Sequence, residues 1–201
     1  MNEASQKSIL RLGLSTDPRW VNLAAMSLGE ILTDHAYCEQ KAATSCISLI
    51  QTYSDKAELV NQLSPIVTEE WGHFRTVLQE LNKRNLPLGR QRKDEYVNSL
   101  AEFEKASRGH ADALLNKLLM CALIEARSCE RFKALSLGLT DVYFREFYRR
   151  FMESEAGHYT LFISLADTYF EKNVVRARWK KWLDFETELI SSLATRGDRI
   201  H

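Results

Sequence analysis

The sequence has few of the residues that break regular structure. It contains 3 prolines and 8 glycines among 201 residues. Proteins built from many short strands need a turn every few residues, and proline and glycine form most of those turns. The sequence therefore does not favour an all-β or loop-rich protein. Its length suits one domain that buries a substantial core.

Long apolar runs are also missing. The longest run, residues 118–124 (LLMCALI), lies between Lys117 and Glu125, whereas a membrane-spanning helix needs about 20 apolar residues. The first ten residues lack the apolar core of a secretion signal. We therefore expect a cytoplasmic protein without a membrane partner. Because 27 basic residues balance 27 acidic ones, the net charge does not indicate a nucleic-acid-binding protein.

The four cysteines form no C-x-x-C pair. They lie at positions 38, 46, 121 and 129, inside segments with a helical pattern. This arrangement predicts buried, reduced thiols rather than disulfides or a zinc site. It also lacks the cysteine pairs that would build an attached iron–sulfur domain.

Helical periodicity is what the sequence does contain. Apolar residues recur every three or four positions, and no long stretch alternates with the period of a strand. We expect Asp17 and Pro18 to begin the first helix, Asp55 and Glu58 to form a capping box, and Gly138 to end the fourth segment. Pro65 either kinks the second helix or marks its start. The expected helices cover residues 18–52, 56–84, 94–106, 110–137, 141–171 and about 174–195.

These segments predict the architecture. Four long helices joined by short connections are typical of an antiparallel bundle. We therefore expect an all-α, antiparallel four-helix bundle with additional helices, in one domain over residues 1–201. The core bundle would cover about 18–171, and the last helix would be added to it.

Two short motifs repeat one pattern of metal-binding residue types. Residues 70–73 and 155–158 both read Glu-x-Gly-His, so two of the five histidines follow a glutamate by three positions. On a helix, residues three apart lie on the same face, so each pair can offer a carboxylate and an imidazole to one metal. Two Glu-x-x-His pairs can arise by chance in a glutamate-rich helical protein, so the two motifs alone are weak evidence for a metal site.

The glutamates upstream make the pattern more specific. Glu39 lies 31 residues before Glu70, and Glu125 lies 30 residues before Glu155. Two antiparallel helices joined by a short turn bring residues at such a separation to one height, as a di-metal bundle site requires. The predicted ligands are Glu39, Glu70, His73, Glu125, Glu155 and His158. Glu130 is an alternative to Glu125, and Asp34 is an alternative to Glu39. With either alternative, the separation from the Glu-x-x-His motif would no longer be about equal in the two halves of the chain.

The ligand types indicate the metal. Four carboxylates and two imidazoles suit iron or manganese and are poor ligands for copper(I). We expect two iron ions that react with O₂. Glu69 and His35 are candidates for orienting the ligands. The alternatives are that Glu69 is only a solvated charge and that His35 is a hydrogen-bonded structural histidine. Gly72 and Gly157, each before a histidine, are unfavourable in a helix and suggest either close approach of a neighbour or ligand, or a packing reason unrelated to chemistry.

Four segments narrow the comparison to one family. The sequences LTDHAYCEQKAA, EEWGHF, LIEARSCERFKAL and ESEAGHY resemble the tRNA hydroxylases that act on 2-methylthio-isopentenyl-adenosine, which are ferritin-like non-haem di-iron monooxygenases. The resemblance covers most of the chain. It implies hydroxylation of the isopentenyl side chain of a nucleoside next to the anticodon, with O₂ and external electrons. It also implies the same six residues as iron ligands.

The resemblance implies tRNA and an electron-donor protein as partners, and no DNA. Basic residues gather at 82–85, 89–93, 145–150 and 176–182, partly interleaved with aromatic residues that can stack on bases. An ordinary solvated surface explains these clusters equally well. The candidate RNA contacts are Arg90, Arg92, Lys93, Arg149, Arg150, Arg176, Arg178 and Lys180.

Two other functions remain open from the sequence. A ferritin-like iron-storage or peroxide-reducing protein would use the same ligands. A metal-free helical interaction protein would carry the glutamates only as surface charge.

Overall fold

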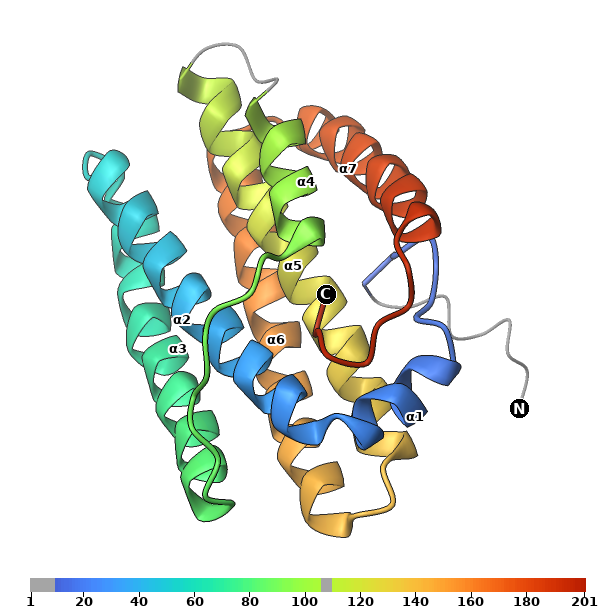
Figure 1. The fold of residues 1–201 in the computed structure, drawn as a ribbon. Coiled ribbons are helices and arrows are strands. Elements are labelled where there is room, and N and C mark those ends of the chain that lie inside the picture. Colours follow the sequence, from blue (N-terminus) through green and yellow to red (C-terminus); the bar gives the residue numbers. More distant parts are fainter. Residues whose placement is uncertain (1–9, 106–109) are drawn as a thin grey trace. The chain divides into compact units, whose positions relative to one another are not determined.

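The computed structural model describes residues 10–105 and 110–201, and all regular structure within them is helical (Figure 1). Residues 1–9, which include most of the segment examined for a secretion signal, lie outside this part. Within it, no helix combines the length and apolar character that crossing a membrane requires. The helices are α1 (Arg19–Met26), α2 (Leu28–Thr52), α3 (Ala57–Lys83), α4 (Glu95–Lys105), α5 (His110–Gly138), α6 (Val142–Tyr169) and α7 (Lys172–Ser192).

The helices group into two compact units. The α2–α3 unit contains residues 19–94 and 196–200, and the α5–α6 unit contains residues 1–18, 95–195 and 201. Each unit is therefore built on one pair of long helices joined by a short connection. That the whole chain forms one domain stays a prediction.

The α2–α3 unit is an antiparallel helix pair. After α2 ends at Thr52, a short turn reverses the chain, and α3 runs back beside it (Figure 1). Both helices bury apolar residues at three- and four-residue spacing, which is the expected pattern for helices that share a core. The buried stripe of α2 includes Ile31, Leu32, Ala36, Cys46 and Leu49, and that of α3 includes Leu59, Leu63, Ile66, Val77 and Leu81.

The structure decides several predictions about where helices begin and end. The single helix predicted over 18–52 is two helices, because Ser27 leaves the helical conformation and its N–H donates to Ala24 O at 3.1 Å. The capping box predicted at Asp55 and Glu58 is wrong, since α3 has Lys56 at its N-cap and no side-chain capping bond there. Pro65 lies inside α3 and does not begin it.

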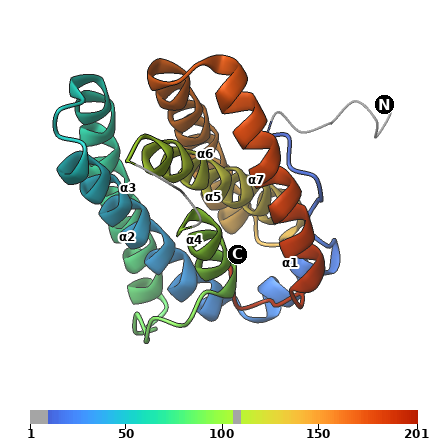
Figure 2. The same ribbon diagram turned by 90° about the horizontal axis from the view of Figure 1, so that it is seen from above.

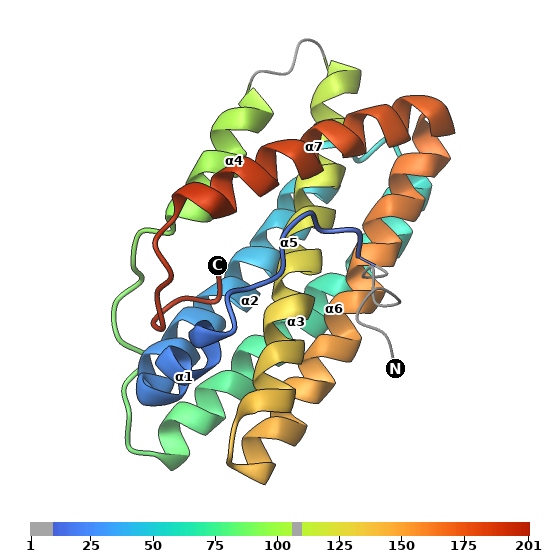
Figure 3. The same ribbon diagram turned by 90° about the vertical axis from the view of Figure 1, so that its right-hand side faces the viewer.

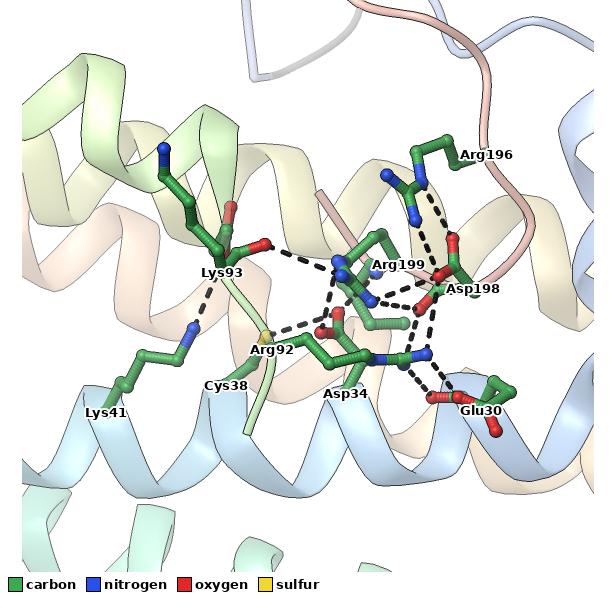
Figure 4. A network of polar contacts seen from close by, with 11 residues as sticks. Glu30, Asp34, Cys38, Lys41, Arg92, Lys93, Arg196, Asp198 and Arg199 are labelled. Atoms are coloured by element: carbon green, nitrogen blue, oxygen red, sulfur yellow. Dashed lines mark hydrogen bonds and ion pairs between the residues drawn. The ribbon is translucent and has the colours of Figure 1, made fainter. Parts of the chain in front are cut away.

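A C-terminal segment, residues 196–200, is attached to the first turns of α2 by a network of charges (Figure 4). The N–H of Ile200 donates to Asp34 Oδ2 at 2.8 Å, and Arg199 lies against Asp198 and the Lys93 carbonyl. Arg92 donates to the Asp198 carbonyl at 2.8 Å and to the Glu30 carbonyl at 2.9 Å. The last residues of the chain thereby fix the helix that carries Glu39.

The α5–α6 unit pairs α5 with α6, and α4 and α7 pack against α5 (Figures 2 and 3). Asp141 caps α6 as an N-cap, because its side chain accepts from the N–H groups of Tyr143 and Phe144. Aromatic rings fill the space between the two long helices. They include Phe132, Phe144, Phe147, Tyr148 and Phe151, whose centroids lie 4.8–6.3 Å apart in neighbouring pairs.

A buried ion pair joins α7 to α5. Arg127 donates from Nε and Nη2 to Glu186 Oε1 at 2.8 and 2.5 Å, and both side chains are fully buried. The same guanidinium donates to Glu130 Oε2 at 2.8 Å and to the Leu14 carbonyl at 3.0 Å. Arg127 therefore ties the N-terminal segment and α7 to one position on α5.

We expect loss of either member of the buried pair to destabilise the protein strongly. Arg127→Met leaves the buried Glu186 without its guanidinium partner, and Glu186→Leu leaves the buried Arg127 with Glu130 in place of two carboxylates. Breaking a buried ion pair in this way costs about 3–5 kcal/mol in free energy of unfolding. The double variant should lose less than the sum of the two, because no charge is then stranded. Urea unfolding of all three variants measures this coupling.

Arg149→Ala provides the control, because Arg149 is 48% exposed and pairs with Glu146 on the surface. It should cost less than about 1 kcal/mol. Additive losses in the double variant would contradict a direct interaction between Arg127 and Glu186.

Candidate metal centre

Three predicted ligands meet inside the α2–α3 unit. Glu39 on α2 and Glu70 and His73 on α3 each place one ligand atom within 4.8 Å of the others. His73 Nδ1 lies 3.4 Å from Glu39 Oε2 and 3.3 Å from Glu70 Oε2. The spacing of 31 residues thus brings Glu39 level with Glu70 across the helix pair, as the sequence predicts.

Burial makes this triad electrostatically unusual. Glu39 and Glu70 are 3% and 1% exposed. Burial and the neighbouring charge of Glu70 raise the pKa of Glu39 to about 8. Burial lowers the pKa of His73, but hydrogen bonds and charge from Glu39 and Glu70 outweigh it and raise that pKa to about 10. Burial thus favours the neutral form of Glu39, and the two neighbouring carboxylates favour the charged form of His73.

His35 and Glu69 lie beside this triad. The fully buried ring of His35 places Nε2 2.6 Å from Glu39 Oε1, which is a strong hydrogen bond to a predicted ligand. Glu69 Oε1 is 3.9 Å from His73 Nε2 and is 46% exposed, so its interaction with the imidazole is weaker. That either residue orients a metal ligand stays a prediction, and His35 has the better geometry for it.

The other three predicted ligands meet inside the α5–α6 unit. Glu125 on α5 and Glu155 and His158 on α6 also place one ligand atom each within 4.8 Å of the others. They are 5%, 3% and 3% exposed. The interpretation of these glutamates as mere surface charge is therefore wrong, since carboxylates are almost never buried to this extent unless they are paired or bind a metal.

The competing carboxylates are engaged elsewhere. Glu130 accepts from Arg127 and from the N–H of Thr16 at 2.7 Å, and Asp34 accepts from the N–H of Ile200. The sequence had no signal for these partners, because Thr16 and Ile200 lie more than a hundred residues away from them. Both alternatives thus have structural roles, which favours Glu39 and Glu125 as the ligands.

Two identical donor sets result, each with two carboxylates and one imidazole. Oxygen and nitrogen ligands of this kind fit Fe(II) or Mn(II). Cys121 and Cys129 lie one turn before and after Glu125, but burial raises the pKa of their thiols to about 12 and about 11. Both are therefore neutral, and all four cysteines are free, as the sequence predicts. The donor chemistry fits the iron that the sequence predicts.

Comparison with known proteins identifies the family. The family model of tRNA-(MS[2]IO[6]A)-hydroxylase (MiaE) matches residues 4–201. The chain belongs to the MiaE family. It is 35% identical over 181 residues to the tRNA 2-(methylsulfanyl)-N(6)-isopentenyladenosine(37) hydroxylase of Pseudomonas putida, which covers 90% of this chain and 87% of the relative. The protein of the same name from Salmonella typhimurium is 28% identical over 227 residues, covering 88% and 82%.

A solved structure with this fold carries a different name. It is Protein 43 with aldehyde deformylating oxygenase activity from Synechococcus, with a TM-score of 0.89, 31% identity and 94% of each chain covered. The predicted all-α, ferritin-like fold class and the predicted tRNA hydroxylase family are both confirmed.

Most of the predicted RNA-contact residues of this MiaE-family chain already have acidic partners. Arg149 lies against Glu146 and Glu153, and Arg150 lies 3.4 Å from Glu146. Arg178 donates to Asp112 at 3.1 Å, and Lys180 to Asp184 at 2.6 Å. Arg92 belongs to the C-terminal network described above. The alternative that these are ordinary charged surfaces is favoured for these five residues, while RNA contact by Arg90, Lys93 and Arg176 stays a prediction.

The glycine before each histidine has no packing neighbour. A Cβ built on Gly72 or Gly157 meets no atom within 4 Å in the described part of the chain. The suggestion that a neighbouring helix approaches closely at these glycines is therefore wrong. The structure does not explain why glycine occupies them.

Gly157→Ala should stabilise the metal-free protein. Gly157 is an exposed position inside α6, where alanine is favoured over glycine by about 1 kcal/mol. Because the added methyl group meets open space, we expect the free energy of unfolding to rise by about 0.5–1 kcal/mol. Urea unfolding measures this change, and a lower stability would reveal a neighbour that the structure does not show.

Proposed function

We propose that the protein hydroxylates the isopentenyl side chain of 2-methylthio-isopentenyl-adenosine next to the anticodon of tRNA. The observation that carries the proposal is the pair of matched Glu-Glu-His triads, whose four glutamates are buried, in a chain of the MiaE family. Both named relatives are hydroxylases of this nucleoside. We place the protein in the cytoplasm, where it would act with an electron-donor protein.

We further propose that the two triads together hold two iron ions. Glu39, Glu70 and His73 supply three ligands, and Glu125, Glu155 and His158 supply the others. Their four carboxylates match the charge of two Fe(II) ions. When bound, the iron pair supplies activation of O₂, so that one oxygen atom enters an allylic C–H bond and the other leaves as water with two external electrons and two protons.

The chain's own residues have supporting tasks. His35 holds Glu39 in one orientation through their 2.6 Å hydrogen bond. Buried apolar side chains lie one or two turns from the proposed ligands, Leu32 and Ala36 before Glu39 on α2 and Phe162 after His158 on α6, and would keep bulk water from the carboxylates. Low water content also strengthens the electrostatic interactions of the triads. Because little water screens their charge, the buried glutamates can attract metal cations strongly.

The ligand assignment predicts loss of iron on substitution. Glu155→Ala and His158→Ala each remove one donor, and we expect the iron content per chain to fall below half of the wild-type value, and hydroxylation to be lost with it. Circular dichroism should stay helical. Metal analysis after anaerobic reconstitution measures the effect.

Glu153→Ala is the matched control, because Glu153 is on the same helix but exposed and paired with Arg149. It should retain full iron content. Full iron stoichiometry in Glu155→Ala or His158→Ala would mean that these residues are not ligands.

The substrate is tested with the reconstituted protein, O₂, a chemical reductant and tRNA that contains 2-methylthio-isopentenyl-adenosine. Nucleoside mass spectrometry should show that nucleoside gaining one oxygen atom, and ¹⁸O₂ should label it. Metal-free protein and the Glu155→Ala variant should give no product. An unchanged nucleoside in the presence of fully loaded protein would contradict the tRNA assignment.

A second candidate follows from the Synechococcus structure, whose name assigns it aldehyde deformylating oxygenase activity. A long-chain aldehyde supplied in place of tRNA tests it with the same loaded protein. Consumption of the aldehyde without modification of tRNA would favour this activity. Iron uptake without either reaction would favour the storage or peroxide-reducing alternative.

A further inference from the structure

An exposed tryptophan stands among the predicted ligands of α3. Trp71 directly follows Glu70 and precedes His73 by two residues, yet it is 47% exposed. Tryptophan is usually well buried in a folded protein. Its ring lies 4.9 Å from that of Phe74, which holds it from one side. The helix therefore presents a flat aromatic surface to solvent, about 100° around α3 from Glu70.

An arginine shares this face of the helix. Arg75 lies one turn after Trp71, so the two side chains project from the same side. It is exposed, and no acidic partner accepts its guanidinium in the part of the chain that the structure describes. This distinguishes it from Arg92, Arg149 and Arg178, whose guanidinium groups are already paired.

The helix surface to one side of Trp71 and Arg75 is open and polar. Gly72 lies one residue after Trp71, where no atom approaches within 4 Å of an added Cβ. Glu69, Thr76 and Gln79 are exposed around it. A stable protein interface buries about 800 Å² on each partner around an apolar centre, and one tryptophan among polar residues does not provide this. A flat aromatic ring beside an unpaired arginine instead fits a base and its phosphate.

We propose that Trp71 and Arg75 form a contact for single-stranded RNA, in which Trp71 stacks on a base and Arg75 binds a phosphate of the same strand. The proposal rests on the proposed function and adds its RNA-binding residues. The anticodon loop offers unpaired bases, and the modified base must bring its isopentenyl group to the ligands on α3. Trp71 is adjacent in sequence to Glu70, so a base that stacks on it would lie on the helix that carries two of the proposed ligands.

Binding of a synthetic anticodon stem-loop RNA to the full-length, iron-loaded protein tests the proposal. Trp71→Ala should weaken binding about tenfold, equivalent to about 1.4 kcal/mol, because stacking on the base is lost. Trp71→Phe should recover most of the affinity. Arg75→Ala should weaken binding and make the salt dependence of log K shallower by about 0.7, as expected for one lost phosphate contact with a single strand.

The control variants match exposure and charge. Tyr143→Ala removes an aromatic residue that is 48% exposed on α6, and Lys105→Ala removes an exposed positive charge at the end of α4. Both should bind RNA as the wild type does. Iron content should be unchanged in every variant, which separates an RNA contact from damage to the ligands.

Two results would overturn the proposal, and they are distinguishable. If the wild type binds the RNA and Trp71→Ala and Arg75→Ala bind it equally well, the contact lies elsewhere and the proposed function stands. If the loaded wild type neither binds nor modifies RNA, the proposed function fails and the contact fails with it.

Discussion

The cost of burying like charges is the constraint on which the rest of this structure depends. Each triad holds two carboxylates inside a helix pair, and Glu39 and Glu70 both lie within 3.4 Å of one imidazole. Ionised carboxylates in such surroundings cost several kcal/mol each unless a cation compensates them. In the α2–α3 unit, His73 provides partial compensation, and burial still raises the pKa of Glu39. Two divalent cations, as proposed for these triads, would balance the charge of all four carboxylates, and metal affinity would then come at the expense of stability in the metal-free state.

The remaining buried charges are handled differently. Arg127 and Glu186 neutralise each other directly, and Arg199 lies near Asp34 and Asp198. In these cases an arginine guanidinium donates several hydrogen bonds and leaves little need for an external ion. The predicted ligands of the α2–α3 unit instead place carboxylates against an imidazole, with His73 beside Glu39 and Glu70. This difference between charges that hold segments together and charges that could bind a cation favours Glu39 and Glu125 over Glu130 as ligands.

Helical period and chain spacing were sufficient to predict much of the molecule. Both are local or nearly local properties, so the long helices and the meeting of Glu39 with Glu70 and His73 could be predicted. The break at Ser27 could not, because serine is tolerated in helices and its departure depends on packing. Nor could the partners of Glu130 and Asp34, which come from the two ends of the chain. Two acidic partners of the basic clusters, Glu30 for Arg92 and Asp112 for Arg178, also lie far away in the sequence, whereas Glu146 and Asp184 lie within one helical turn of Arg149 and Lys180.

Helix α3 shows how one helix can serve two purposes. Its 3.6-residue period directs Glu70 and Phe74 inward, with His73 beside them, while Trp71 and Arg75 project to solvent from the same two turns. If Trp71 stacks on a base, as proposed, that base lies on the same helix as two of the proposed ligands, Glu70 and His73. Side chains on one helix keep a more constant separation than side chains on a mobile loop, so the proposed RNA contact and the proposed ligands would stay in one fixed relation along α3.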